Sequence, residues 1–387
     1  MSASTSSCRF VCSRVSITRF SVSEFRNLSA QQLDVPPGLT AVVGPNGSGK
    51  TSLLEALAVL GNLTSFRPGP AASWIQHGAH GFGLAAAVER GGAAVEIRQE
   101  VRLRGTVGRS LFRGARRLGA AEYLDLLPVA TLSGHDRALV WGAPEDRRRF
   151  LDRLCFQLRP EALPVLQRYR RALRQRNALL ARSARGDEFD AFEQDLSQLG
   201  AHVINARLAA VAGLERVLGY ELEALGWSMG RAVLSYTSTD GVAVAEPATL
   251  AARLRAALAA SRRLERGRGH TAVGPHRHDL QLTVHGAPAR ETLSAGQGKL
   301  LATGLKLAAM AVVGRERGRT PVVVFDDVDA ELDAEVLRRV IGRLERGAQA
   351  LLSSAHEEMM LPRLTRGAVW RMASGTVEGD APGGSEA

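Results

Sequence analysis

Lysine is scarce in this chain, although basic residues are not. Of its 387 residues 50 are basic, and only Lys50, Lys299 and Lys306 among them are lysine, the rest being arginine. Lysine carries a compact ammonium group on a flexible stem, whereas the planar guanidinium of arginine has a fixed fork shape. A lysine kept at one position of such a chain therefore indicates a site where a guanidinium would not fit.

Cysteine is also scarce, with only Cys8, Cys12 and Cys155 in the chain. Three cysteines cannot form a disulfide framework, and they lack paired cysteine or histidine partners at zinc-binding spacing. We therefore expect reduced thiols, as in a cytoplasmic protein. The first twenty residues lack the apolar core of a signal peptide, and no run approaches the roughly 20 apolar residues of a membrane span.

The charge balance is strongly basic, with a formal net charge of +11 and a pI near 10.6. Net charge bears on association with polyanions rather than on the fold, and nucleic acid is the usual polyanion met by a soluble intracellular protein. We expect direct contact with nucleic acid. The alternative is a protein that is basic without such a partner.

A glycine-rich motif, GPNGSGKT, surrounds the first of the three lysines. It fits the pattern G-x-x-x-x-G-K-[ST], and it follows the apolar run LTAVV and precedes the helix-like TSLLEALAVL, as a phosphate-binding loop requires. Backbone amides and the helix N-terminus would hold phosphates, Lys50 would reach the β and γ phosphates of ATP, and Thr51 would bind Mg²⁺. The predicted ATP-binding residues are Gly44, Pro45, Asn46, Gly47, Ser48, Gly49, Lys50, Thr51 and Ser52.

A second motif, PVVVFDD, reads as a buried strand that ends in two carboxylates. Asp326 is predicted to complete the Mg²⁺ site opposite Thr51. Asp327 is predicted to be a catalytic residue, together with Lys50, because a carboxylate there could orient or deprotonate the attacking water. Alone, a hydrophobic strand ending in two aspartates is common, and the glycine-rich motif is what makes this one a candidate site.

A third motif, LSAGQ, opens a helix, and its Gly296 lies 30 residues before Asp326. By itself it is also compatible with a helix that Ser294 merely caps. The three motifs together resemble the ATP-binding cassette superfamily. The resemblance implies a head-to-tail homodimer with two ATP molecules between the subunits, in which Ser294, Gly296 and Gln297 act in trans.

Further segments narrow the resemblance to one family. FRNL (25–28), LTSFR (63–67), EDRRRFLDR (145–153), YRRALRQRNALL (169–180), VGPHRHDL (273–280) and VVVFDDVDAELD (322–333) resemble the RecF family of bacterial recombination mediators. The resemblance implies a head like that of structural maintenance of chromosomes (SMC) proteins. It also implies duplex or gapped DNA as ligand, RecO and RecR as partners in loading RecA, weak DNA-stimulated ATP hydrolysis, and a place at the nucleoid.

Several positions depart from the superfamily pattern. Ala330 stands where the D-loop usually has serine, although Asp333 of that loop remains. His356 is a candidate for the switch histidine and is equally compatible with a surface histidine. The Q-loop glutamine is not evident, with Gln76 and Gln99 as candidates.

The most consequential departure is Asp327, which stands where most cassette ATPases have glutamate. The shorter side chain withdraws the carboxylate by ~1.5 Å, and misplacement on the 1 Å scale can cost about 100-fold in rate. We expect slow hydrolysis, which suits a switch that ATP closes and hydrolysis opens.

The hydrophobic pattern, taken with the resemblance, predicts an α/β fold with an inserted α-helical arm. Apolar positions recur at helical spacing through 145–182 and 189–226. The head should be an ABC-type P-loop ATPase of mixed sheet and helices, with lobes I and II. The predicted segments are a disordered extension (1–14), lobe I with the P-loop (15–143), the arm (144–265), lobe II with the signature motif (266–375) and a disordered tail (376–387).

Arginines crowd the first arm helix, and four of them are predicted to contact DNA phosphates: Arg170, Arg171, Arg174 and Arg176. The alternative is a solvated helix face whose arginines pair with the acidic residues of the next helix. Two other functions also remain open at this point, the ATPase subunit of a transporter and an SMC-like ATPase that tethers chromosomes.

Overall fold

The computed structural model describes residues 13–182, 186–238, 247–360 and 367–378. The chain forms two compact units, residues 1–135 with 306–387 and residues 136–305. The segments predicted from the sequence divide the chain by function, so their boundaries near 143 and 265 differ from those of the compact units. These boundaries stay predictions.

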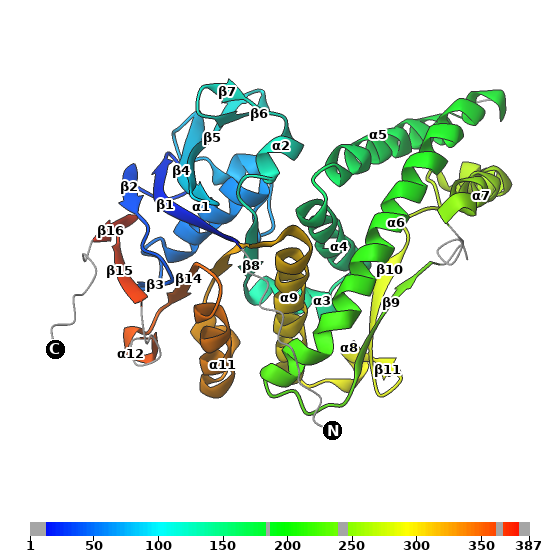
Figure 1. Cartoon of the computed structure of the whole chain (residues 1–387). Helices are drawn as coiled ribbons and strands as arrows, with labels where there is room; N and C mark the ends of the chain where they lie inside the picture. The colour runs from blue at the N-terminus through cyan, green and yellow to red at the C-terminus, as the bar shows by residue number, and fades with distance from the viewer. Residues whose placement is uncertain (1–12, 183–185, 239–246, 361–366, 379–387) are drawn as a thin grey trace. The chain divides into compact units, whose positions relative to one another are not determined.

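The first unit contains a largely parallel sheet built from the most apolar runs of the chain (Figure 1). Its strands, in spatial order, are β16 (Thr376–Glu378), β15 (Gly367–Ala373), β3 (Leu39–Val43), β14 (Ala350–Ser354), β13 (Val322–Phe325) and β8 (Val129–Leu132). Strands β3, β13 and β14 are buried along their whole length, as expected for parallel strands covered on both faces. Because β14 lies between β3 and β13, the segments that follow all three strands meet at one edge of the sheet.

Helix α1 (Lys50–Asn62) packs on this sheet, against β8, β13 and β14. Twelve of its thirteen residues are buried, which explains the run of apolar side chains from Leu53 to Leu60 that only Glu55 interrupts. The other helices of the unit are η1 (Ala71–Trp74), α2 (Ala120–Leu124), α10 (Val328–Glu331), α11 (Ala334–Glu345) and α12 (Glu357–Met360).

A second, mainly antiparallel sheet completes the first unit. Its order is β12 (Arg319–Thr320), β1 (Ser13–Ser23), β4 (Gly81–Arg90), β5 (Ala93–Arg104), β6 (Thr106–Arg113) and β7 (Arg116–Arg117), with β2 (Gln31–Asp34) also paired to β1. Between residues 81 and 117 this sheet is antiparallel throughout, with β4, β5, β6 and β7 paired in chain order.

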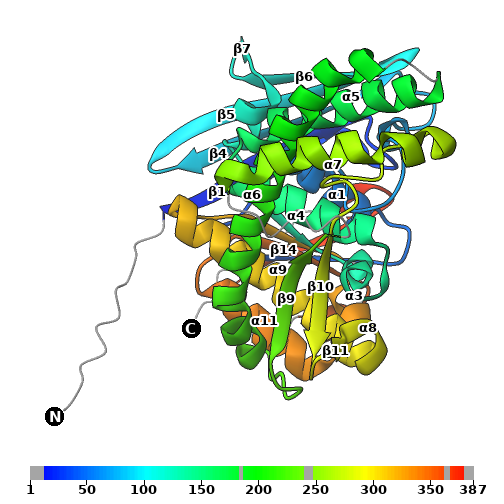
Figure 2. The same ribbon diagram turned by 90° about the vertical axis from the view of Figure 1, so that its right-hand side faces the viewer.

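The second unit consists of long helices and a small antiparallel sheet (Figure 2). Its elements are α3 (Ala138–Trp141), α4 (Pro144–Leu158), α5 (Ala162–Ala181), α6 (Gly186–Ala224), β9 (Ala232–Thr237), α7 (Pro247–Arg268), β10 (Asp279–Val284), β11 (Ala287–Pro288) and α8 (Ala289–Thr292). The turn η2 (Gly134–Arg137) precedes it, and α9 (Ala295–Arg317) begins in it and ends in the first unit. The predicted helical arm is therefore present, and α5 and α7 both pack on α6.

The arm has a hydrophobic core that uses apolar positions of the predicted helical periodicity. Leu166 and Tyr169 of α5 pack with Leu199 and Val203 of α6, and Leu258 of α7 joins them. The periodicity predicted through 145–182 and 189–226 is thus confirmed at the α5 and α6 positions, and the core joins three helices.

Both chain ends were predicted to be disordered, and this prediction needs two corrections. Thr376–Glu378 form β16 against β15, because their register continues the hairpin that begins at Ala373, so this part of the predicted tail is wrong. Ser13 and Arg14 pair with Arg319 and Thr320 in β1, so the predicted extension is also wrong there. Residues 1–12 and 379–387 lie outside the described part. No helix in that part is long and apolar enough to cross a membrane.

Within the second unit, a buried histidine anchors α5 to the VGPHRHDL segment. His276 Nε2 lies 3.0 Å from the Thr271 carbonyl oxygen, and its Nδ1 lies 2.7 Å from the Tyr169 hydroxyl. A carbonyl oxygen only accepts, so Nε2 carries the proton and Nδ1 accepts from Tyr169. Burial lowers the pKa of His276 to about 4, and the positive charge of Arg277 contributes in the same direction.

The low pKa of His276 predicts a loss of stability in mild acid. The unfolded chain takes up a proton near the ordinary histidine pKa of about 6.5, whereas the folded chain does so only near pH 4. Stability is therefore unaffected above about pH 6.5 and falls as the pH drops toward 4. Between pH 7 and 4.5, urea unfolding should show the native chain losing about 2 kcal/mol more than His276→Gln. The exposed His202, changed to Gln, is the control, and equal pH slopes for native chain and His276→Gln would contradict the assignment.

Candidate functional site

The glycine-rich loop joins β3 to α1 and has the backbone that a phosphate-binding loop needs. Gly44 and Gly49 have φ of 147° and 111°, in the region that favours glycine. A Cβ on Gly44 would lie 2.4 Å from the Met372 carbonyl oxygen, so the loop also fits closely against β15. With α1 beginning at Lys50, the loop amides and the helix N-terminus form a site for phosphate oxygens.

The lysine of the motif lies inside this loop. Lys50 is 6% exposed, and its Nζ donates to the carbonyls of Gly44, at 2.8 Å, and Pro45, at 3.1 Å. A tetrahedral ammonium group can make these contacts and still turn toward a phosphate, whereas a guanidinium has no room there. The geometry thus gives a physical reason for the rare lysine.

Asn27, in the FRNL segment, braces the loop from outside. Its Oδ1 accepts from the Ser52 hydroxyl at 2.7 Å, and its Nδ2 donates to the Gly47 carbonyl at 3.2 Å. A further contact joins the Gly375 amide to the Ser48 carbonyl. FRNL was identified as a family segment, but no sequence pattern indicated that Asn27 contacts the loop.

The predicted magnesium residues lie together. The Thr51 hydroxyl donates to Asp326 Oδ1 at 3.0 Å, and the Ser353 hydroxyl donates to the same oxygen at 2.8 Å. Burial raises the pKa of Asp326 above its usual value and the Asp327 charge adds to this, while the two hydroxyl bonds oppose it. A hydroxyl and a carboxylate are the hard oxygen ligands that Mg²⁺ prefers, so the pair fits this ion.

The neighbouring Asp327 has an unusual backbone. Its φ of 58° is left-handed, and its amide donates to the Ser353 hydroxyl at 2.9 Å. Ser353 therefore contacts the Asp326 carboxylate and the Asp327 backbone, and it comes from β14, between the other two strands. Nothing in the sequence pattern singled out Ser353, although it belongs to the SSAHEE segment. Left-handed backbone at a residue other than glycine is typical of functional sites.

The signature residues belong to the second unit, at the start of α9. Ser294 and Gln297 form a reciprocal cap: the Ser294 amide donates to Gln297 Oε1 at 2.9 Å, and the Gln297 amide donates to Ser294 Oγ at 3.3 Å. Ser294 and Gly296 are exposed, and no atom lies within 4 Å of a Cβ placed on Gly296. A Cβ on Gly298 would lie 2.0 Å from the Trp141 ring, which supports the first turn from behind. The helix therefore presents to solvent an N-terminus that is capped only by its own residues.

The remaining predicted site residues have mixed positions. Asp333 caps α11 by accepting from the amides of Glu335 and Val336, which is a structural role compatible with a D-loop. His356 is exposed, so its role as a switch stays a prediction. Gln76 donates to the Leu28 carbonyl at 3.4 Å, and the Leu28 side chain lies against Gly49. Gln99 is fully buried on β5, which leaves Gln76 as the better Q-loop candidate.

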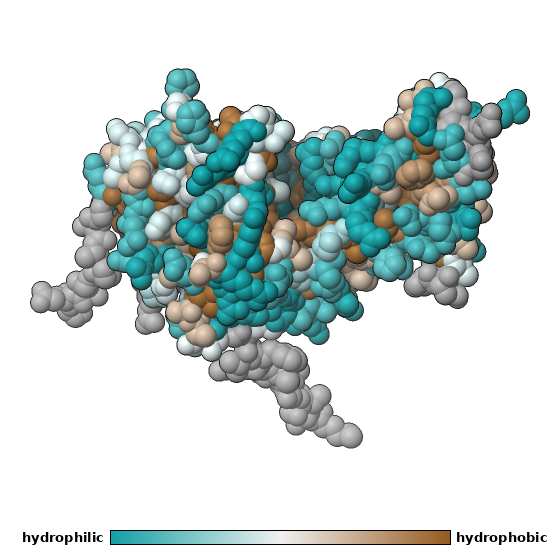
Figure 3. Space-filling view, turned by 90° about the horizontal axis from the view of Figure 1, so that it is seen from above, coloured by the Kyte–Doolittle hydropathy of each residue, from teal (hydrophilic) through white to brown (hydrophobic). Residues whose placement is uncertain are grey.

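The four arginines proposed to contact DNA differ in exposure. Arg170, Arg171 and Arg174 are exposed on α5, Arg170 also pairing with Asp152 at 3.2 Å. The face of the molecule in Figure 3 is mostly hydrophilic, with smaller hydrophobic areas between. Arg176 needs a correction, because it is fully buried and cannot meet DNA.

Arg176 instead holds the arm together from inside. Its guanidinium pairs with Glu193 at 3.0 Å and Glu265 at 2.7 Å, and both carboxylates are buried. It also donates to Thr271 Oγ1 and to the Leu258 carbonyl. Removing one partner of such a buried pair typically costs about 3–5 kcal/mol. The sequence could not separate Arg176 from its neighbours, because its partners lie on α6 and α7.

Comparison with known proteins shows the family of the chain. A family model for the RecF/RecN/SMC N terminal domain matches residues 16–366. The chain is 35% identical over 344 residues to the DNA replication and repair protein RecF of Synechococcus sp. (strain JA-3-3Ab), covering 86% of this chain and 89% of that protein.

Solved structures support the same assignment. The structure of the recombination mediator protein RecF with ATP in the RecFOR pathway superimposes with a TM-score of 0.85 and 25% identity, covering 95% of this chain and 98% of that one. An SMC head bound to the C-winged helix domain of ScpA gives a TM-score of 0.51 at 17% identity, covering 93% of this chain and 95% of that one, which shows a shared fold alone. The predicted ABC-type head is therefore confirmed, and the chain belongs to the RecF family of DNA replication and repair proteins.

Proposed function

We propose that this protein binds ATP with Mg²⁺ in the loop at residues 44–52 and uses it as a switch in recombinational DNA repair. The observation that carries the proposal is the 3.0 Å contact between Thr51 and Asp326, which joins the loop to the carboxylate after β13. Lys50 would hold the β and γ phosphates, and Thr51 and Asp326 would hold Mg²⁺, which screens the phosphate charge when bound. The ATP named for the solved RecF relative supports this ligand.

The second part of the proposal is an ATP-driven head-to-tail homodimer. The exposed N-terminus of α9, with Ser294 and Gly296, offers amides and a hydroxyl suited to a γ-phosphate held by another subunit. Asp333 is proposed to line the same interface. Asp327 would orient the attacking water, and its short side chain would keep hydrolysis slow, so that the dimer persists.

The third part is DNA binding by the closed dimer. Arg170, Arg171 and Arg174 are the exposed cations that would track the phosphates of duplex or gapped DNA. The RecFOR pathway named for the solved relative supports RecO and RecR as partners in loading RecA. DNA would stimulate the weak ATPase, and the protein would act in the cytoplasm at the nucleoid.

A DNA-binding titration with and without ATP, at several salt concentrations, tests the proposal. If each protomer of a dimer contributes three arginines, about six phosphates are neutralised, and affinity should fall roughly 10³-fold between 50 and 200 mM salt. ATP should tighten DNA binding, because only the dimer presents the arginines of both protomers to one DNA molecule. Replacing Arg170, Arg171 and Arg174 with Gln should flatten the salt dependence, and Arg346→Gln, an exposed arginine of the first unit, is the control.

Affinity that ignores both nucleotide and salt would sink the proposed coupling. In that case ATP binding and DNA binding would be independent properties of the protein.

A further inference from the structure

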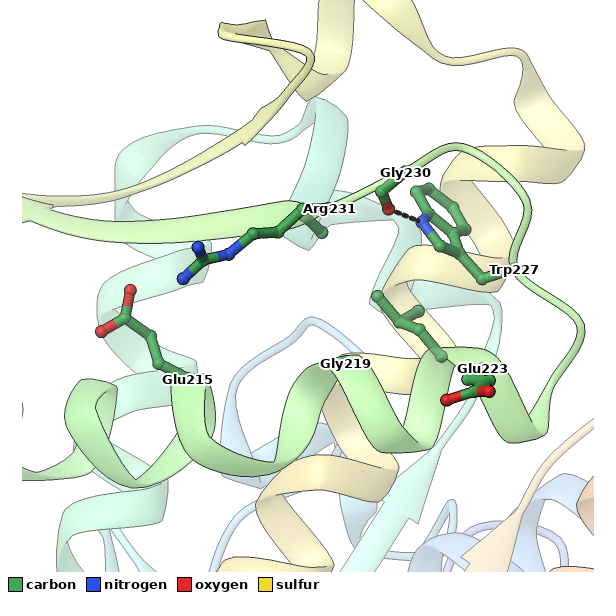
Figure 4. A pocket seen from close by; sticks show the side chains of 8 residues that line it. Glu215, Gly219, Glu223, Trp227, Gly230 and Arg231 are labelled. Atoms are coloured by element: carbon green, nitrogen blue, oxygen red, sulfur yellow. Dashed lines mark hydrogen bonds between the residues drawn. The ribbon is translucent and has the colours of Figure 1, made fainter.

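A cavity of about 230 Å³ lies in the second unit, between α6 and the start of β9 (Figure 4). It lies apart in sequence from every motif of the nucleotide site. Its lining residues are Glu215, Gly219, Leu222, Glu223, Trp227, Gly230, Arg231 and Ala232.

Three of these residues form one face of α6. Glu215, Gly219 and Glu223 follow at intervals of four, so they share a side of the helix, and the two carboxylates are separated by ~12 Å along its axis. No atom lies within 4 Å of a Cβ placed on Gly219. The missing side chain therefore leaves an open floor between the two glutamates.

The two carboxylates have no ion pair within the described residues. Other exposed glutamates, such as Glu145 and Glu335, pair with arginine, whereas these two keep a charge that no ion pair neutralises. Figure 4 shows Glu215 and Arg231 facing one another across the cavity, without an ion pair between them among the described contacts. In a chain with a net charge of +11, this cavity is locally acidic.

The cavity wall that faces this side of α6 contains an aromatic residue, Trp227. The Trp227 indole N–H donates to the Gly230 carbonyl at 2.6 Å, so the ring is fixed and offers the cavity an apolar surface (Figure 4). Tyr220, next to Gly219 along α6, is 71% exposed. Tryptophan, tyrosine and arginine are the residues enriched at the energetic centres of protein interfaces, and aromatic faces attract cations.

Size and charge together restrict the occupant. The cavity is smaller than the roughly 300–1,000 Å³ of small-molecule sites, so it suits a projecting side chain better than a whole ligand. The two carboxylates outnumber the single arginine of the lining, so the cavity disfavours a phosphate of the DNA backbone. We propose that this cavity takes an arginine side chain of a partner protein, with Glu223, the carboxylate on the Trp227 side, as its charge partner and Trp227 beside its stem. Glu215 adds negative charge at the far end of the cavity.

The position of the cavity connects it with the signature helix. Met229, in the loop that closes the cavity, accepts a contact from Gln297 Nε2 at 3.0 Å. Leu222, on the cavity wall, packs so closely on α9 that a Cβ on Gly304 would lie 2.4 Å from it. A partner seated here would thus contact the segments that support Ser294.

Peptide binding to the whole chain, measured by fluorescence anisotropy without nucleotide, tests the proposal. The probes are nine-residue labelled peptides with a central arginine and varied apolar neighbours, each matched by a peptide with the neutral isostere citrulline. At least one arginine peptide should bind ten-fold or more tightly than its citrulline match, despite the repulsion between a basic peptide and a basic protein. Because no ATP is present, failure here leaves the proposed ATP switch untouched.

Two sets of variants locate the binding. Changing Glu215 and Glu223 together to Gln should weaken binding at least ten-fold, and Gly219→Leu should abolish it by filling the cavity. The matched controls on exposed positions of α6, Asp195→Asn and Ala212→Leu, should change it less than two-fold.

Three results would overturn the proposal. They are the absence of arginine-dependent binding throughout the set, unchanged binding by Gly219→Leu, and self-association without nucleotide that the two glutamine substitutions remove. The last result would mean that a second copy of this chain fills the cavity.

Discussion

Lys50→Ala should reduce ATP hydrolysis by about 100- to 1,000-fold, the range typical when one hydrogen-bond donor to a developing oxyanion is removed. Lys50 Nζ is buried within the loop and bound to the Gly44 and Pro45 carbonyls, so the variant removes a cation that is held in a fixed position. Lys306, in the same unit, donates to Thr131 instead. The measurement is steady-state hydrolysis with DNA present, together with direct binding of labelled ATP.

Lys50→Arg makes the test sharper, because it keeps the charge. If the site needs only a cation, this variant should hydrolyse ATP nearly normally. The 6% exposure of Lys50 argues otherwise: a planar guanidinium cannot occupy the same space without displacing loop carbonyls, and a 1 Å displacement can cost about 100-fold. Arg346→Ala is the control for loss of a surface cation. Activity of Lys50→Ala within ten-fold of the native chain would contradict the assignment.

The nucleotide site was largely predictable because its signals are local. The glycine-rich loop, the strand before Asp326 and the helix start at Ser294 are each set by a few consecutive residues. Each of these segments needs its particular backbone conformation or its burial, however the rest of the chain folds. The sequence therefore identified Lys50, Thr51 and Asp326 before any contact between them was known.

The supporting residues were not predictable, because distant segments bring them in. Asn27 and Ser353 touch the site only because of the order of strands in the sheets, and a single sequence carries no record of that order. The burial of Arg176 likewise depends on α6 and α7 packing around it. Side-chain type alone does not distinguish the buried Arg176 from the exposed Arg174, two residues away.

One missed feature did have a local signal. Residues 145–182 read as continuous helical periodicity, yet α4 ends at Leu158 and α5 begins at Ala162. Pro160 lacks an N–H and disfavours helical backbone in the residue before it, and Arg159 is indeed extended, with φ of −140° and ψ of 95°. The hydrophobic period continued across the break, so proline was the better guide there.

Ser294→Asp should abolish the proposed ATP-driven dimer while leaving ATP binding by the single chain intact. Aspartate caps a helix as well as serine does, so the start of α9 should be preserved. Its charge would however face the γ-phosphate held by the other subunit, and like charges across an interface cost several kcal/mol. Light scattering should show that at least 100-fold more protein is needed for dimerisation with ATP.

Two companion variants separate charge from capping and from bulk. Ser294→Ala loses the cap, worth about 1 kcal/mol, but adds neither charge nor volume, so its dimer should weaken by only about ten-fold or less. Ser294→Arg attracts phosphate but fills the space that the phosphate needs, and it should fail as Ser294→Asp does. If Ser294→Asp instead dimerises with ATP like the native chain, Ser294 cannot face a phosphate of the partner. The exposed N-terminus of α9 would then be only a capped helix end, and the nucleotide pocket would have to be complete within one copy.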